Sequence, residues 1–355
     1  MQVPVRVWLM ILLGCLSLSA RAAEPIFLNN TNQFFSPAAQ LQYLVDSSNK
    51  LTLATLPEIM QWQTLKAPQL NLGYLNSPVW IHFSLQRSET LPADWYLLVQ
   101  YAMLDSIDVY MTTAGTTEDI YHLALGDHLP FAQRPVIHPE FIAPLHLADT
   151  QRYDVYLRVQ STGSLQVPLT IANPEFFWQH DRYRAMFEAG GFCICLVMAL
   201  YNFVLFLFLK DRSYFFYVMY ILCFVVGFGT MRGWGYQFLW PGIPRLQDWA
   251  LIVTTLCGAA SALMFATSFM RLAQIAPRLN HVVTVSATFC SLFVFVALVI
   301  PYHAGIQLAV GCILFFSISM SVLASAVWYQ THSRQAALYC FSWILLLIGA
   351  SLYMG

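Results

Sequence analysis

Hydrophobic and polar residues follow two different patterns along this chain of 355 residues. Between about residues 24 and 184, short stretches alternate apolar and polar positions, which is typical of half-buried β-strands. From about residue 187 onward, apolar runs of roughly 20 residues follow one another, and this length suits a membrane-spanning helix. The pattern therefore predicts a β-rich domain in water followed by a helical bundle in lipid.

The first half contains several strands whose apolar residues fall on one face. The clearest faces are Val79, Ile81, Phe83 and Leu85; Tyr153, Val155, Leu157 and Val159; and Leu165, Val167, Leu169 and Ile171. Further strands are predicted over 95–101 and 107–111, and turn-forming clusters rich in Pro, Gly, Asn and Ser separate them. Many short strands without a long helical pattern between them predict a β-sandwich of the jelly-roll kind.

The second half contains six apolar segments of membrane-spanning length. They lie at 187–209, 213–231, 248–270, 282–301, 304–329 and 336–354. If the first segment begins outside the cell, the loops expected in the cytosol hold Lys210, Arg212, Arg271, Arg278 and Arg334. The loops on the other side hold only Arg232 and Arg245, so the positive-inside rule agrees with this orientation.

The first residues have the layout of a secretory signal peptide. Arg6 supplies a basic region, residues 7–18 an apolar region, and Ala20-Arg21-Ala22 a cleavage site between small residues. An uncleaved anchor is the alternative, although the apolar run is short for a span. Lipoprotein processing at Cys15 is a further alternative that would leave a very short apolar region.

These signals together predict the organisation of a bacterial inner-membrane protein with an exported N-terminal domain. The expected parts are a signal peptide at 1–22, a periplasmic β-sandwich at 23–178, a juxtamembrane link at 179–186 and a multi-pass bundle at 187–355. Six spans are an even number, which would return Gly355 to the outside. We therefore expect a seventh span and a cytosolic module to follow residue 355, with a complete six-span protein as the alternative.

Composition sharpens this picture in three ways. Only 10% of residues are charged and 58% are hydrophobic, whereas soluble domains carry about 25% charged residues. The net charge of −1 gives no reason to expect nucleic-acid binding. Of eight cysteines, one lies in the signal segment and the others lie in the apolar half, so the exported domain must depend on its own core and not on disulfides.

The exported half offers a few residues suited to a polyhydroxylated ligand, because aromatic rings beside charged and imidazole groups can stack on it and hydrogen-bond to it. The candidate ligand-binding residues are Trp80, Asp105, Tyr110, Asp127, Arg134, His138 and Arg158. The alternative is that the rings belong to the core and the charges to the surface. Neither a catalytic motif nor a dense set of metal ligands around Asp127, His128 and His138 appears, so we predict no enzyme activity, metal or cofactor.

Several motifs, in order along the chain, resemble a known bacterial family. In the second half they are Ala199-Leu-Tyr-Asn202, Lys210-Asp-Arg-Ser-Tyr214 and Gly233-Trp-Gly-Tyr236; in the first half they are the stretch 71–80, Leu104-Asp105-Ser-Ile-Asp108-Val-Tyr110 and Gly126-Asp127. The chain is similar to the seven-transmembrane receptors with diverse intracellular signalling modules. The resemblance implies a jelly-roll sensor domain, the family's second extracellular type, likened to carbohydrate-binding modules. It also implies a cytosolic output domain, often a diguanylate cyclase or a histidine kinase.

The leading hypothesis is a receptor that senses a small, carbohydrate-like ligand outside the membrane. Its bundle would relay binding to a cytosolic signalling module or partner, and a homodimer is left open. The predicted spans hold almost no ionisable residue, which argues against an ion or proton pathway. A transporter or channel with an exported accessory domain is the alternative, and a membrane-bound enzyme is a weaker third.

Overall fold

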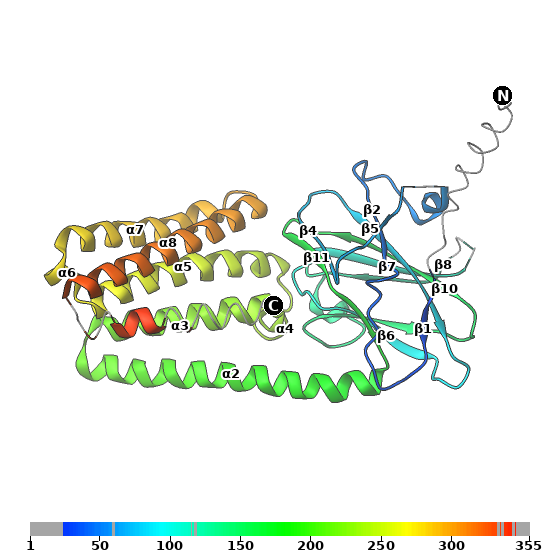
Figure 1. Ribbon diagram of the computed structural model, residues 1–355, viewed down its shortest axis with the longest axis horizontal. Coiled ribbons are helices and arrows are strands. Elements are labelled where there is room, and N and C mark those ends of the chain that lie inside the picture. Colours follow the sequence, from blue (N-terminus) through cyan, green and yellow to red (C-terminus); the bar gives the residue numbers. More distant parts are fainter. Residues whose placement is uncertain are drawn as a thin grey trace, which may run out of the picture.

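The computed structural model describes residues 24–58, 61–114, 116, 119–331, 334, 337–342 and 345. A β domain and a helical bundle lie end to end, with the helices running roughly along the long axis of the molecule (Figure 1). The predicted signal peptide at 1–22 lies outside the described residues, as does most of the sixth predicted span at 336–354.

The β domain contains twelve strands in three sheets within the described residues. They are β1 (Ile26–Leu28), β2 (Gln42–Val45), β3 (Gln63–Thr64), β4 (Leu70–Tyr74), β5 (Val79–Arg87), β6 (Asp94–Val99), β7 (Ser106–Thr113), β8 (Asp119–Leu125), β9 (Phe141–His146), β10 (Tyr153–Gln160), β11 (Ser164–Val167) and β12 (Leu169–Ala172). The large sheet has the order β3-β2-β5-β10-β7-β8, with β1 beside β5. The two smaller sheets are β12-β6-β9 and β11-β4.

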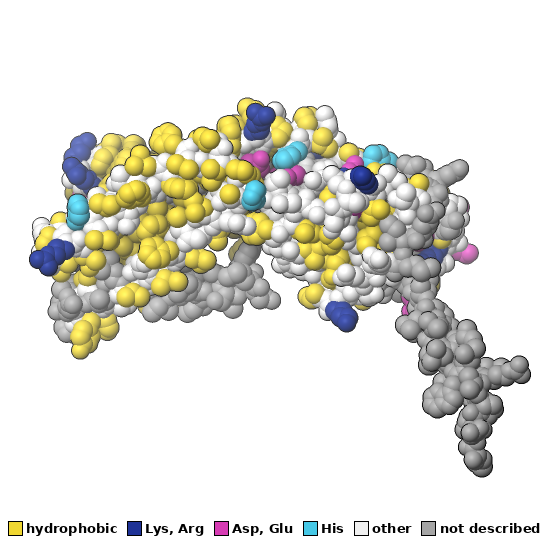
Figure 2. Space-filling view, turned by 90° about the horizontal axis from the view of Figure 1, so that it is seen from above, with side chains coloured by type: hydrophobic (Ala, Val, Ile, Leu, Met, Phe, Trp, Pro, Cys, Tyr) yellow, Lys and Arg dark blue, Asp and Glu magenta, His cyan; other side chains and the backbone are white. Residues whose placement is uncertain are grey.

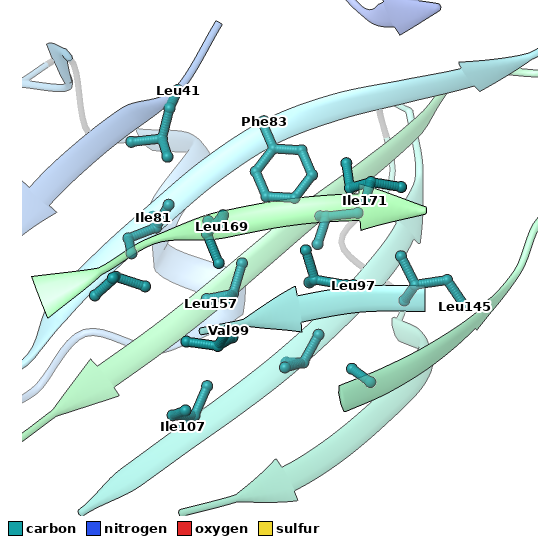
Figure 3. Packing of buried hydrophobic residues seen from close by; sticks show 14 of the residues in the cluster. Leu41, Ile81, Phe83, Leu97, Val99, Ile107, Leu145, Leu157, Leu169 and Ile171 are labelled. Carbon is teal, nitrogen blue, oxygen red and sulfur yellow. The ribbon is translucent and has the colours of Figure 1, made fainter. Parts of the chain in front are cut away.

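The core lies between the large sheet and the β12-β6-β9 sheet. Phe83 of β5 and Leu157 of β10 pack on one side, and Leu97 of β6 and Ile171 of β12 pack on the other (Figure 3). The three predicted apolar faces are all at most 6% exposed. Burial of each such side chain contributes about 1.5–3 kcal/mol. The predicted β-sandwich is confirmed.

One predicted strand is divided in the structure. The apolar positions from Leu165 to Ile171 belong to two strands, because β11 pairs with β4 whereas β12 pairs with β6. Pro168 lies at the break and has no backbone N–H to offer a ladder. The alternation of apolar and polar residues continues through the proline, so this pattern does not reveal that the chain passes from one sheet to another.

Within the described residues, the helical part contains five helices that are long and apolar enough to cross a membrane. The described helices are α2 (Pro174–Leu209), α3 (Arg212–Met231), α4 (Trp234–Phe238), α5 (Pro244–Phe269), α6 (Leu272–Ile275), α7 (Pro277–Ala297) and α8 (Tyr302–Thr331). The first five predicted spans therefore correspond to α2, α3, α5, α7 and α8. Helix α5 is central, since it contacts α3, α7 and α8.

Helix α2 joins the two parts without a flexible segment. It follows β12 directly, and the Asn173 side chain caps it by accepting a hydrogen bond of 3.0 Å from Glu175 N. Pro174 occupies the first helical position, where its missing N–H costs nothing. The expected link at 179–186 is thus part of a helix of 36 residues, about 54 Å long.

Candidate functional site

The seven candidate residues are divided between two places. Trp80, Tyr110 and Arg158 lie on strands of the large sheet, β5, β7 and β10. The other four, Asp105, Asp127, Arg134 and His138, lie in loops at the end of the β domain that contacts the helices. The structure therefore does not unite them in one pocket.

The first place is the outer surface of the large sheet, where aromatic rings form a row. The strand register aligns His82, Tyr156, Tyr110 and His122 across four neighbouring strands. His82 stacks on Tyr156 and Tyr110 stacks on His122, each pair with ring centroids 4.5 Å apart. We call this surface the aromatic face, and it comprises Trp62, Trp80, His82, Tyr110, His122 and Tyr156.

Trp80 lies on the same face but is covered by neighbouring residues such as Leu44 and Leu56. It is only 1% exposed, and its ring stacks on Tyr110 at 5.9 Å. Within the described residues its Nε1 has no hydrogen-bond partner. Trp80 thus positions Tyr110, whereas the other rings of the aromatic face all keep some exposed area for a ligand.

Charged groups border the aromatic face on the same strands. Arg158 donates to Asn49 Oδ1 at 2.7 Å and lies 3.9 Å from Asp108. Asp154 accepts a hydrogen bond of 2.5 Å from Ser84. Burial would raise the pKa of Asp154, but the contacts with His82 and Ser84 lower it below its ordinary value. Fixed charges next to stacked rings can hydrogen-bond the hydroxyl groups of a polar ligand.

The second place is the contact between the β domain and the bundle. Arg134 is 8% exposed and donates to the carbonyl oxygens of His138 and Pro139 at 2.8 and 2.9 Å. Its guanidinium lies 4.5 Å from the centres of the Phe131 and Phe141 rings. Burial lowers the pKa of Arg134 to about 10. Arg134 therefore holds its own loop in shape.

His138 belongs to a chain of ion pairs between the β domain and α2. Its Nε2 lies 3.2 Å from Asp181 Oδ1, and Arg184 lies 3.1 Å from the same oxygen. Arg184 also lies 3.0 Å from Glu140, whose side chain is only 4% exposed. Removal of one partner from a buried pair leaves an uncompensated charge, which makes such contacts costly to break.

This set of ion pairs continues to α2 and to the turn that follows α3. Arg232 pairs with Glu188, and it lies 3.9 Å from Glu140. Trp234 donates its indole N–H to Glu188 at 2.8 Å. We call these residues the junction network: His138, Glu140, Asp181, Arg184, Glu188, Arg232 and Trp234.

A separate group of carboxylates and a histidine lies at the same junction. His128 Nε2 is 3.8 Å from Asp105 and 3.7 Å from Asp248, which belongs to α5. The contact with Asp248 and the charges of Asp105 and Asp127 raise the pKa of His128 to about 9, against the effect of burial. Burial, with the charges of Asp105 and Asp248, raises the pKa of Asp127 well above its ordinary value. Figure 2 shows acidic and histidine side chains gathered where the helices meet the β domain.

The sequence did not point to several of these residues. Tyr156 and His122 on the aromatic face, and Glu140, Asp181 and Arg184 in the junction network, were not among the candidates. Tyr156 could have been found from the alternation, because it occupies an outward position of a strand whose inward face was recognised. His122 lies on β8, a strand that the sequence analysis did not predict. The ion pairs join residues far apart in the chain, and local patterns do not reveal such partners.

The arrangement is that of a multi-pass membrane protein with a β-rich domain before its apolar helices. Comparison with protein families agrees with it. Residues 38–173 match the model described as 7TMR-DISM extracellular 2, and residues 184–355 match the model described as 7TM diverse intracellular signalling. The chain belongs to this family of seven-transmembrane receptors with diverse intracellular signalling modules. A comparison with curated proteins finds no match.

Proposed function

We propose that this receptor binds a carbohydrate-like small molecule on the aromatic face and relays binding through α2 and the junction network. The proposal places the β domain in the periplasm and the bundle in the inner membrane, with a signalling module on the cytosolic side. The observation that carries it is the row of stacked rings across four strands, bordered by Arg158 and Asp154. Rings of this kind stack on the apolar faces of sugars, while charged neighbours bind the hydroxyl groups.

The relay rests on the connection between the sandwich and the bundle. Strand β12 lies in the sandwich and continues into α2, whose Phe177 is buried against Leu98 and Ile142 of the β domain. Because the joint is helical and ion-paired, a shift of the β domain would move α2 as a rod. A ligand acts through such a joint only if it binds one of two arrangements more tightly.

Binding is tested with the full chain in detergent micelles and a panel of oligosaccharides. We expect titration to quench or shift tryptophan fluorescence, since Trp62 packs against His82 and Tyr156. Tyr156→Ala should weaken binding about tenfold, which corresponds to about 1.4 kcal/mol. Tyr74→Ala is the matched control, because Tyr74 is 48% exposed on β4, outside the aromatic face. Equal affinities of the two variants, or binding of no saccharide, would reject the site.

The relay is tested separately by hydrogen exchange of the first turns of α2. Addition of the ligand should change the rate of hydrogen exchange in these turns of the wild-type chain. Glu140→Gln should leave saccharide affinity unchanged and reduce that response, because Glu140 joins Arg184 of α2 to the β domain. An unaltered response in this variant would show that the junction network does not carry the signal.

A further inference from the structure

The junction holds a group of potential metal ligands that is distinct from the aromatic face. Asp105, Asp127 and His128 each offer one ligand atom, and these atoms lie within 4.8 Å of one another. Asp248 reaches the same place from α5, with its Oδ2 3.7 Å from His128 Nε2. Ligands around a tetrahedral zinc ion lie about 3.3 Å apart, given bonds of about 2.0–2.1 Å. The observed spacing, up to 4.8 Å, is wider than this, so the side chains would draw together around a bound ion.

Asp127 is the observation that points to a ligand. Its side chain is 1% exposed, and within the described residues its Oδ1 has no hydrogen-bond partner. A buried carboxylate oxygen without a hydrogen-bond partner loses its contacts with water, and no other interaction compensates for that loss. Three carboxylates meet one imidazole here, so negative charge is in excess. A divalent cation would supply both the missing partner and the missing charge.

The surrounding structure holds the first ligand, Asp105, in place. Thr162 donates its backbone N–H and its hydroxyl to Asp105 Oδ2, both at 2.8 Å, and Ser161 donates to Oδ1 at 3.3 Å. Outer hydrogen bonds of this kind orient metal-binding carboxylates. His128 has a side chain that is 46% exposed, which leaves a path from solvent to the group.

We propose that Asp105, Asp127 and His128 bind a divalent transition-metal ion such as Zn²⁺, with Asp248 of α5 as a further ligand. Imidazole together with carboxylates suits ions of this type. The ion would replace the proton of His128, since the imidazole must be neutral to bind a metal. It would also join the β domain to the central helix of the bundle. This site does not depend on the identity of any ligand at the aromatic face.

Metal binding is measured on the full chain in detergent after treatment with a chelator, with Zn²⁺ as the probe in calorimetry and elemental analysis. We expect one ion per chain and a rise in the unfolding temperature. Asp127→Asn, which keeps the shape of the side chain, and His128→Ala, at an exposed position, should each weaken binding more than tenfold. Asp154→Asn is the matched control, because it removes another largely buried carboxylate of the β domain.

Zinc can also bind thiols, and the bundle contains free cysteines. Co²⁺ distinguishes the two cases, because thiolate ligands give an intense charge-transfer band that oxygen and imidazole ligands lack. The proposal expects a Co²⁺ spectrum without that band, lost in His128→Ala. Absence of stoichiometric binding, a thiolate spectrum, or unchanged affinity in both variants would overturn it. Loss of affinity in Asp248→Asn supports the role of α5, whereas unchanged affinity would confine the site to the β domain and overturn the link to the bundle.

Discussion

At the scale of single residues, Gly126 allows two loops of the β domain to approach more closely than any side chain permits. Its φ is +144°, and a Cβ added there would lie 2.2 Å from Asp105 O. The close approach is fixed by backbone hydrogen bonds from Asp127 to Leu104 O and from His128 to Asp105 O. The sequence motif Gly126-Asp127 is thus the means by which distant acidic residues meet.

Backbone strain alone costs about 1–3 kcal/mol. Gly126→Ala is expected to lower the free energy of unfolding by more than this, because the added Cβ also overlaps Asp105 O. Gly73→Ala is the control, because Gly73 also has positive φ, +64°, but an added Cβ meets nothing within 4 Å. Denaturant unfolding followed by tryptophan fluorescence compares the two. A loss in Gly126→Ala no larger than that in Gly73→Ala would contradict the steric argument.

Asp154 gives the β domain a predictable response to acid. Its pKa lies below the ordinary value of 3.8. The contribution of the ionised Asp154 to folding stability is therefore fully present above that pH and is lost as the pH falls through the lowered pKa. Asp154→Asn should be less stable than the wild type at neutral pH. The difference should shrink between about pH 5 and pH 2. Thermal melts across this range test it, and a difference independent of pH would contradict the assignment.

At the scale of elements, the joint between β12 and α2 depends on one cap. Asn173→Ala removes the acceptor for Glu175 N and should cost about 1 kcal/mol, whereas Asn173→Asp should retain most of it. The unfolding temperatures of the two variants, measured by circular dichroism, provide the comparison. An equal decrease of the unfolding temperature in Asn173→Ala and Asn173→Asp would mean that the side-chain oxygen at this position does not cap α2.

The elements also show how far local patterns can be trusted. Strands such as β5 and β10 were predictable because period-two alternation directly marks a buried face. The spans were predictable because the bilayer sets their length. The division at Pro168 and the continuation of α2 through 174–186 were not, since both depend on which neighbour each segment meets. Asp105 and Asp127 were selected by residue type, but their meeting with Asp248 requires the tertiary fold.

At the scale of the whole molecule, the junction decides whether the β domain and the bundle behave as one unit. Glu140 comes from the β domain and Arg184 from α2, and their 3.0 Å contact is largely shielded from water. Asp181 and Arg232 lie close to the same pair, so some coupling is shared with them. The side chains of the network therefore add to the covalent link between β12 and α2, and they extend the contact to the end of α3.

A double-mutant cycle with Glu140→Gln and Arg184→Met measures this link. Each single change should destabilise the chain: Arg184→Met leaves the buried carboxylate of Glu140 with a poorer partner, and Glu140→Gln removes one of the two carboxylates that pair with the half-buried Arg184. The loss in the free energy of unfolding of the double variant should be smaller than the sum of the losses of the two single variants, with an interaction energy of about 0.5–3 kcal/mol. Arg182→Met is the control for removal of a basic residue from the same turns of α2, since Arg182 is exposed. If the two changes are additive, the Glu140–Arg184 contact contributes no coupling, and the domains are joined by the backbone of α2 and by their other contacts, such as the apolar contacts of Phe177 and the ion pair of His138 with Asp181.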